Sequence, residues 1–331
     1  MPYSTPDKTT LVTGANGFIG RALLSGLVRG NLEARAAVRS RDNFRHDDFI
    51  KHVPVYVVKD IGPATDWTEA LDGVKSVVHL AARVHIMRED AKDPLAEFRR
   101  VNTMGTIQLA LQAAAAGVRR LIYVSTIKVN GEATFDRPFL EDDILRPSDP
   151  YAISKWEAEQ ALRRISTETG MEIVIVRPPL VYGPGVGGNF LTMLKWIERG
   201  VPLPLASVDN RRSLVGLDNL VSLLMECLSQ PRAAGETFLV SDGEDLSTPD
   251  LLRRTALALG KSSLLFPCPV TLLHMAARLF SKGEACERLC GSLALDTGKA
   301  QRLLGWNAVS TVDAELQRTA DWYQRRRVSA M

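Results

Sequence analysis

The hydrophobic residues of the first 180 positions follow two alternating rhythms. Short runs rich in β-branched residues, typical of buried strands, are separated by longer stretches in which apolar residues recur every three or four positions, as in an amphipathic helix. Strands are expected at residues 9–13, 34–38, 53–58, 76–80, 121–124 and 172–176, and the clearest helices at 18–28, 94–116 and 151–169. This alternation predicts an α/β fold, a Rossmann-type doubly wound parallel sheet with helices on both faces.

The rhythm changes after Arg177-Pro-Pro. A loop rich in Gly and Pro, residues 182–188, leads into a helix that begins near Asn189, and the remainder is mainly helical with short strands near 213–215 and 237–240. We therefore expect two domains with approximate boundaries: a Rossmann domain, residues 1–180, and a smaller, mainly helical ligand-binding region, residues 181–331. The chain can cross back between them, and the smaller region is expected over the carboxyl edge of the sheet.

Charge and hydropathy exclude several classes of partner. The chain has 331 residues, of which 24% are charged, and a formal net charge of +3. This near balance gives no electrostatic reason to expect nucleic acid or an anionic membrane as a partner. The most apolar late stretch, residues 264–280, contains two prolines, His274 and Arg278, so an amphipathic docked helix over about 270–280 is expected rather than an integral membrane segment. The N-terminus lacks the apolar run of a signal peptide, and a cytoplasmic location is expected.

All four cysteines lie in the C-terminal third, at Cys227, Cys268, Cys286 and Cys290. Cys286 and Cys290 are four residues apart, but no second His/Cys pair accompanies them in the sequence, as a zinc site would require. We therefore expect no metal, and interpret the cysteines as free thiols of a reducing compartment.

Three glycines follow the first predicted strand and open the first helix. Gly14 permits a tight turn, Gly17 allows the backbone to approach a pyrophosphate, and Gly20 allows the helix to pack closely on the strand. The N–H groups at the start of that helix would then face the phosphates. A glycine-rich turn without a ligand is the alternative. The expected dinucleotide contacts here are Gly14, Asn16, Gly17, Phe18, Ile19 and Gly20.

The second strand ends in Arg39, where a carboxylate would bind a ribose 2′-hydroxyl. An arginine instead accommodates a 2′-phosphate, so NADP(H) is expected to be preferred, with NAD(H) possible as cofactor. The alternative for Arg39 is an exposed loop residue. Asp60 and Ile61, after the third strand, are expected to flank the adenine.

Tyr151 and Lys155 are four residues apart and so lie on one helix face. A free phenol, with a pKa of about 10, is a poor acid or base near neutrality, and a neighbouring ammonium makes its proton easier to move. Ser125 and Thr126 follow a strand, where a hydroxyl can hold a substrate oxygen. Each feature is common by itself. Their combination with the glycine loop favours a hydride-transfer enzyme.

These motifs together resemble the extended short-chain dehydrogenase/reductase superfamily of nucleotide-sugar epimerases, dehydratases and 4-reductases. The similarity covers residues 9–306 and rests on the glycine loop, Val124-Ser-Thr126, Tyr151-x-x-x-Lys155, Arg177-Pro-Pro-Leu-Val-Tyr-Gly-Pro184 and Leu-Leu-Gly-Trp306. The resemblance implies that residues 1–180 bind a dinucleotide and residues 181–331 bind a nucleotide sugar.

The resemblance also assigns roles to residues. It implies a catalytic set of Thr126, Tyr151 and Lys155, with Tyr151 and Lys155 also touching the cofactor. The further cofactor contacts that it implies are Leu80, Ala81, Ala82, Asn102 and Pro178, and the substrate contacts expected are Ser125, Thr126, His85, Asn189 and Arg212, the last two holding the diphosphate. A helix start and a guanidinium both suit a diphosphate.

Departures from family patterns narrow the expected reaction. The 4,6-dehydratases carry Asp-Glu directly after the catalytic Thr, where this chain has Ile127 and Lys128, and the late Arg-x-Gly-Asp motif is missing. The stretch His79–Asn102, together with Ser125-Thr-Ile-Lys-Val-Asn-Gly, resembles reductases that convert a UDP-4-keto-6-deoxy-HexNAc at C4 to UDP-N-acetylquinovosamine for bacterial O-antigen and other surface polysaccharides, and this reaction is expected. A UDP-hexose or UDP-HexNAc 4-epimerase with tightly bound NAD is the alternative. A non-catalytic NAD(P)-binding sensor is more remote, because a sensor needs no proton donor.

The resemblance implies a homodimer as well. The helices expected at 94–116 and 151–169, doubled by a two-fold axis, would form a four-helix bundle. Trp156, Ala161 and Ile165 are the expected contacts, with packing inside one chain as the alternative.

Overall fold

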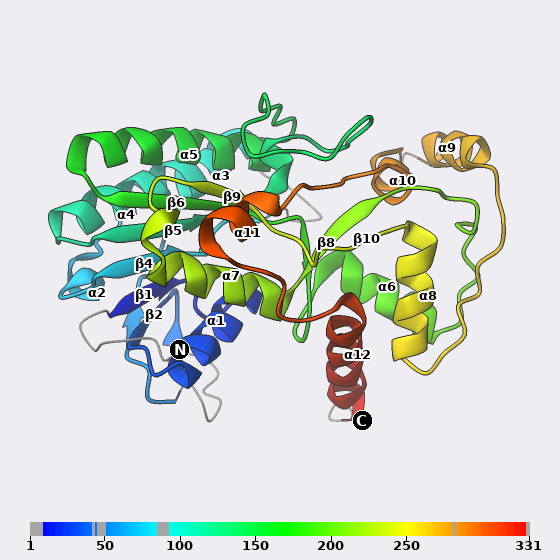
Figure 1. Ribbon diagram of the computed structural model, residues 1–331, viewed down its shortest axis with the longest axis horizontal. Helices are drawn as coiled ribbons and strands as arrows, with labels where there is room; N and C mark the ends of the chain where they lie inside the picture. The colour runs from blue at the N-terminus through cyan, green and yellow to red at the C-terminus, as the bar shows by residue number, and fades with distance from the viewer. Residues whose placement is uncertain (1–8, 42–43, 45–50, 85–92, 281–282, 329–331) are drawn as a thin grey trace.

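A seven-stranded, all-parallel sheet forms the larger layer of the computed structural model, which describes residues 9–41, 44, 51–84, 93–280 and 283–328 (Figure 1). The strand order is β3-β2-β1-β4-β5-β6-β9. The strands are β1 (Thr10–Thr13), β2 (Ala34–Val38), β3 (Val55–Val57), β4 (Ser76–His79), β5 (Arg120–Val124), β6 (Glu172–Arg177) and β9 (Thr237–Leu239). The order reverses at β1, which confirms the expected Rossmann-type fold.

Helices cover both faces of this sheet. Figure 1 shows α4 (Gly105–Ala115) and α5 (Pro150–Thr169) along one face, and α1 (Phe18–Arg29) and α7 (Leu217–Ser229) along the other. Successive residues of a strand point to opposite faces, so Leu11 joins the core under α4 and α5 while Val12 joins the core under α1 and α7. The smaller helices α2 (Thr68–Leu71) and α11 (Gly298–Leu304) complete these two cores.

The helix expected at 94–116 is divided into three segments. They are α3 (Pro94–Phe98), a π-helical stretch η2 (Arg99–Met104) and α4. Gly105 opens α4 against the loop after β3, where a Cβ would lie 2.6 Å from the Ile61 side chain. The spacing of the apolar residues continues through all three segments, so the sequence did not predict the wider, π-helical turn at η2. Such turns are frequent at functional sites, and this one carries Asn102.

The second layer contains a three-stranded sheet of order β10-β8-β7 and a helical region on the right of Figure 1. Its elements are β7 (Leu180–Tyr182), β8 (Arg212–Gly216), β10 (Asp245–Leu246), α6 (Gly188–Glu198), α8 (Thr248–Ala258), α9 (Val270–Leu279), α10 (Gly283–Cys290) and α12 (Val312–Val328). A separate apolar core unites α6, α8 and α12.

The chain crosses between the two layers more than once. β9 comes from beyond residue 180 yet pairs with β6 as the last strand of the large sheet, and α7 and α11 cover one face of that sheet. A single cut at residue 180 therefore does not separate the layers. None of the helices in the described part of the chain combines the length and the apolar character that a membrane span requires.

Candidate active site

The glycine loop forms a close-fitting cradle between β1 and α1. Gly14 has φ of 64°, and a Cβ there would lie 2.9 Å from the backbone of Ala81. At Gly20 a Cβ would lie 2.3 Å from the Gly14 carbonyl oxygen. Gly17 caps α1, and no side chain caps that helix end. The exposed N-terminus of α1 and the bare loop suit a pyrophosphate.

The segment after β4 forms the opposite wall of this cradle. The Leu80 and Ala81 N–H groups both donate to the Thr13 hydroxyl at 3.2 Å. The ring of the buried His79 makes two hydrogen bonds. Its Nδ1 lies 2.6 Å from the Thr13 hydroxyl, and its Nε2 lies 3.0 Å from the Thr106 hydroxyl. Burial, and secondarily the charge of Lys155, lowers the pKa of His79 to about 3, so the ring is neutral and braces β1, β4 and α4. The structure thus places Leu80 and Ala81 beside Thr13 and Gly14, while their contact with a cofactor stays a prediction.

Asn102 links this wall to α5. Its amide accepts from the Arg83 N–H at 2.8 Å and donates to the Arg83 carbonyl at 3.0 Å and to Ser154 Oγ at 3.0 Å. The side chain is buried. Asn102 therefore fixes the loop after β4 against the helix that carries Tyr151. Sequence reasoning did not find Ser154 as its partner, because the two residues meet only in the fold.

The first turn of α5 positions Tyr151 and Lys155. Asp149 caps the helix by accepting from the Ala152 N–H at 2.6 Å. One turn on, the buried Lys155 ammonium donates to the Val124 carbonyl at 2.8 Å and lies 4.1 Å above the Tyr123 ring. These contacts place Lys155 at the carboxyl end of β5, directly before Ser125 and Thr126. Burial lowers the pKa of Lys155 to about 7, although the nearby Glu159 carboxylate opposes the shift.

Tyr151 packs edge-on against Phe98, with ring centroids 6.0 Å apart. Burial, followed by the charge of Asp149, raises the pKa of its phenol to about 12. Lys128 forms an ion pair with Asp149 and a second, at 3.3 Å, with Glu132. Lys128 thus stands where a dehydratase has an acid, and it partly neutralises the carboxylate beside Tyr151.

Ser125 and Thr126 follow β5 and face the end of β6. The Ser125 N–H donates to the Val176 carbonyl at 2.7 Å, but its hydroxyl is buried and has no hydrogen-bond partner among the described residues. Thr126 caps a short 3₁₀ turn, η3 (Ile127–Val129), and the Ile127 N–H donates to the Pro178 carbonyl at 3.0 Å. Pro178 and Thr126 are therefore neighbours, and the unpaired Ser125 hydroxyl fits a site that closes around a ligand.

A buried ion pair holds α5 to the sheet behind this site. Arg177 donates to both carboxylate oxygens of Glu159, at 3.1 and 2.6 Å, and also to Asn130 and the Glu141 carbonyl. Both side chains are almost fully buried. Sequence reasoning missed the pair, since nothing in the spacing of Arg177 and Glu159 predicts that they meet.

The expected adenine-side residues lie along the edges of β2 and β3. Arg39 is exposed directly after β2, near enough for its charge to contribute to a lowered pKa of Asp60. The main cause of that lowering is Arg100, which donates to Asp60 at 2.8 Å. Ile61 is buried against Gly105. Asp60 thus forms an ion pair with Arg100 on η2, the segment that also carries Asn102.

The expected substrate residues lie in the second layer. Asn189 is exposed in the first turn of α6. Arg212, at the start of β8, is half-buried and donates to the Gly291 carbonyl at 2.9 Å, and burial lowers the pKa of its guanidinium. His85 lies outside the described residues. Cofactor and substrate contacts at all these positions stay predictions.

Comparison with known proteins decides the family. A model of the "NAD dependent epimerase/dehydratase family" matches residues 10–241, which include the glycine cradle, Thr126, Tyr151 and Lys155. The chain belongs to the NAD dependent epimerase/dehydratase family. The match confirms the family-level expectation drawn from the motifs. The match does not distinguish the 4-ketoreductase subgroup from other members of the family.

Relatives of the chain extend over nearly its whole length. It is 40% identical over 316 residues to a UDP-glucose 4-epimerase of Vibrio cholerae, covering 95% of this chain and 94% of that protein. It is 25% identical to an N-acetyl-alpha-D-glucosaminyl-diphospho-ditrans,octacis-undecaprenol 4-epimerase of Escherichia coli O157:H7, covering 96% and 95%.

Solved structures of other proteins share the fold. A UDP-glucose 4-epimerase of Thermotoga maritima with UDP-glucose has a TM-score of 0.76 at 21% identity, covering 96% of this chain and 99% of that one. A dTDP-glucose 4,6-dehydratase of Streptomyces venezuelae, with NAD bound, has a TM-score of 0.76 at 27% identity, covering 97% and 98%. The cofactor bound in this neighbour is NAD, so the neighbour does not support the expected preference for NADP.

Proposed function

We propose that the protein is a 4-epimerase of a UDP-linked hexose or N-acetylhexosamine. The observation that carries the proposal is the 40% identity, over 95% of the chain, to a UDP-glucose 4-epimerase. The site agrees with this reaction, since Tyr151 and Lys155 start α5 beside Thr126, at the carboxyl end of β5.

In this reaction Tyr151 acts as the phenolate when it takes the proton from the C4 hydroxyl, and the phenol so formed returns that proton to the C4 oxygen, which regenerates the phenolate. A nicotinamide cofactor, when bound, supplies the oxidant for the first half of the cycle and the reductant for the second. Thr126 donates to the C4 oxygen, and Lys155 orients and tunes the phenol. Asn189 and Arg212 hold the diphosphate, so that the sugar can turn within the site while the nucleotide stays fixed.

Dehydration is the reaction that the site supports least. Its acid–base pair would stand at Ile127 and Lys128. Ile127 is buried and apolar, and Lys128 is paired with Asp149 and Glu132. Neither residue can exchange a proton with sugar carbons in the way that an Asp-Glu pair does.

A second candidate is the reduction of a UDP-4-keto-6-deoxy-HexNAc at C4 to UDP-N-acetylquinovosamine. Arg39 favours it, because an enzyme that exchanges NADPH at each turnover needs a site for the 2′-phosphate, and Arg39 is exposed at the tip of β2. In that reaction Tyr151 donates its proton to the C4 oxygen once per cycle, and the same residues act.

One assay separates the two candidates. The purified protein is incubated with UDP-glucose and UDP-N-acetylglucosamine without added cofactor, and separately with the UDP-4-keto-6-deoxy-HexNAc and NADPH or NADH. Interconversion of C4 epimers without added cofactor, by protein that carries bound NAD, supports the epimerase. Stoichiometric cofactor oxidation with the keto sugar, and no interconversion, assigns the reductase instead.

The cofactor preference is tested at Arg39. If its guanidinium binds a 2′-phosphate, Arg39→Asp should weaken NADPH binding by at least about tenfold while changing NADH binding little. Arg41→Asp is the matched control, because Arg41 is also exposed in this loop but donates to the Val55 carbonyl at 3.1 Å. Fluorescence titration measures both affinities. Equal losses for the two cofactors would refute the proposed role.

A further inference from the structure

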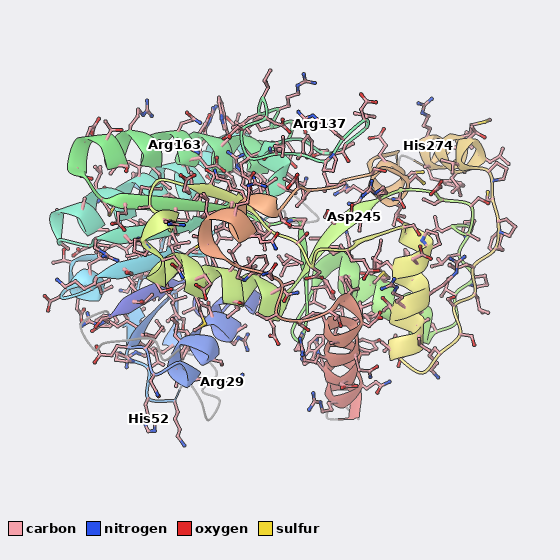
Figure 2. The ribbon with its side chains drawn as sticks, viewed as in Figure 1. Arg29, His52, Arg137, Arg163, Asp245 and His274 are labelled. Carbon is pink, nitrogen blue, oxygen red and sulfur yellow. The ribbon has the colours of Figure 1, made fainter. Side chains whose placement is uncertain are left out.

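Three metal-ligating side chains meet outside the active site, where α9 packs against α10. His274 lies on α9, and Cys286 and Cys290 lie four residues apart on α10, on one face of that helix. Figure 2 labels His274 beside the α9–α10 hairpin. One ligand atom from each residue lies within 4.8 Å of the others.

The distance between the two sulfurs suits a metal. The Cys286 and Cys290 Sγ atoms are 3.8 Å apart. Two thiolates each about 2.3 Å from a tetrahedral Zn²⁺ are separated by roughly 3.8 Å, whereas a disulfide needs about 2.05 Å. The separation of the two sulfurs therefore matches that of two thiolate ligands of one metal ion, and it is too long for a disulfide bond.

The first of the two helices, α9, packs loosely on the rest of the protein, with only Val270 and Leu273 of its described residues in contact with the apolar core. No residue of α9 is fully buried, and Leu272, Met275 and Leu279 are largely exposed. Helices of this length are marginal without packing. Cys286 is buried while His274 and Cys290 are half-buried, so an ion can reach the cluster from solvent and retain a water as its fourth ligand.

We propose that His274, Cys286 and Cys290 bind one thiophilic metal ion, Zn²⁺ by preference, which clips α9 to α10. Cys290 directly precedes Gly291, whose carbonyl accepts from Arg212 and from Asn210, each at 2.9 Å. The ion would thus fix the end of α10 beside Arg212, at the start of β8. Two thiolates and an imidazole select such an ion over Mg²⁺ or Ca²⁺, which prefer oxygen.

The test uses the full chain, reduced with a phosphine and freed of metal. Co²⁺ should bind at one equivalent and give a sulfur-to-cobalt charge-transfer band, and Zn²⁺ should displace it, because Zn²⁺ binds such sites more tightly. Cys290→Ser should weaken binding by at least about tenfold, and so should His274→Ala. Cys268→Ser is the matched control: its half-buried thiol precedes α9 and lies outside the cluster, so binding should not change.

The wild-type titration alone can overturn the proposal. Reduced protein that gives no charge-transfer band binds no metal through these thiols. A Cys268→Ser variant that loses as much affinity as Cys290→Ser would also refute it, as would a His274→Ala variant with unchanged affinity. Thermal unfolding gives a second readout: Zn²⁺ should raise the melting temperature of the wild type and of Cys268→Ser, but not that of Cys290→Ser.

Discussion

At the scale of the residue, Tyr151 is the side chain on which the proposed chemistry depends. Burial, followed by the charge of Asp149, raises its pKa to about 12, so both oppose ionisation of the phenol. Tyr151→Phe keeps the ring packed on Phe98 but removes the transferable proton. Turnover should fall by about a hundredfold or more, the usual scale for a general acid or base, while cofactor affinity stays nearly the same.

Steady-state kinetics and a cofactor titration measure the two effects of Tyr151→Phe. Tyr323→Phe is the control, because that phenol donates to Glu198 in the second layer, away from the site, and should leave turnover unchanged. A Tyr151→Phe variant with near-normal turnover would exclude Tyr151 as the proton donor.

Lys155 makes stability depend on pH. Its pKa is about 7 in the folded chain and about 10.4 when unfolded, so between these values the unfolded chain binds more protons. The contribution of this group to the free energy of unfolding therefore rises with pH from about 7 to about 10, and it is most unfavourable below pH 7. Lys155→Met should remove the effect. Urea unfolding at pH 7 and pH 9 measures the free energy of unfolding of both proteins. The stability of the wild type relative to the variant should be higher at pH 9 than at pH 7, and a stability difference that does not change with pH would contradict this.

At the scale of the element, the start of α1 depends on the absence of a side chain at Gly20. A methyl group there would meet the Gly14 carbonyl oxygen at 2.3 Å and the Ala15 backbone at 2.8 Å, atoms that move only with the loop itself. Gly20→Ala should therefore destabilise the protein by about 1–3 kcal/mol. It should also weaken cofactor binding, because the helix end would shift from the phosphates.

The control for Gly20→Ala is Gly26→Ala, which makes the same change in the same helix. Its methyl group would meet only the side chains of Val221 and Met225, at 3.0 and 3.3 Å, and these can adjust. Both variants gain helix propensity, so the difference between them reports the close approach at Gly20. Urea unfolding and cofactor titration measure it, and equal behaviour of the two variants would contradict the argument.

At the scale of the whole molecule, α4 and α5 lie side by side on one face of the sheet, where the predicted dimer contact would form. Ala161 and Ile165, two of the expected dimer contacts, are buried within the chain, and Ile165 belongs to the core under α5. Trp156 is half-buried, and Leu111 on α4 is 45% exposed. A four-helix interface would therefore use Leu111 and Trp156.

Light scattering at micromolar concentration should give twice the chain mass if this interface forms. Leu111→Arg should shift the mass toward one chain, because a charge in an apolar interface lacks a partner. Leu257→Arg is the control, since Leu257 is 78% exposed on α8, in the other layer. A monomeric wild type would exclude the dimer.

The sequence by itself determined the fold class and the family, and it gave the prediction that Thr126, Tyr151 and Lys155 form the catalytic set. Short β-branched runs and helical runs of period 3.6 are local signals, and the glycine loop and the Tyr151–Lys155 pair each lie within one short segment. The tertiary structure alone decided the rest. Residues from different elements meet in the Asn102–Ser154 hydrogen bond, in the Arg177–Glu159 pair, in the pairing of β9 with β6, and in the cluster of His274 with Cys286 and Cys290. Such contacts depend on how elements pack against one another, and neither periodicity nor spacing along the chain encodes that packing.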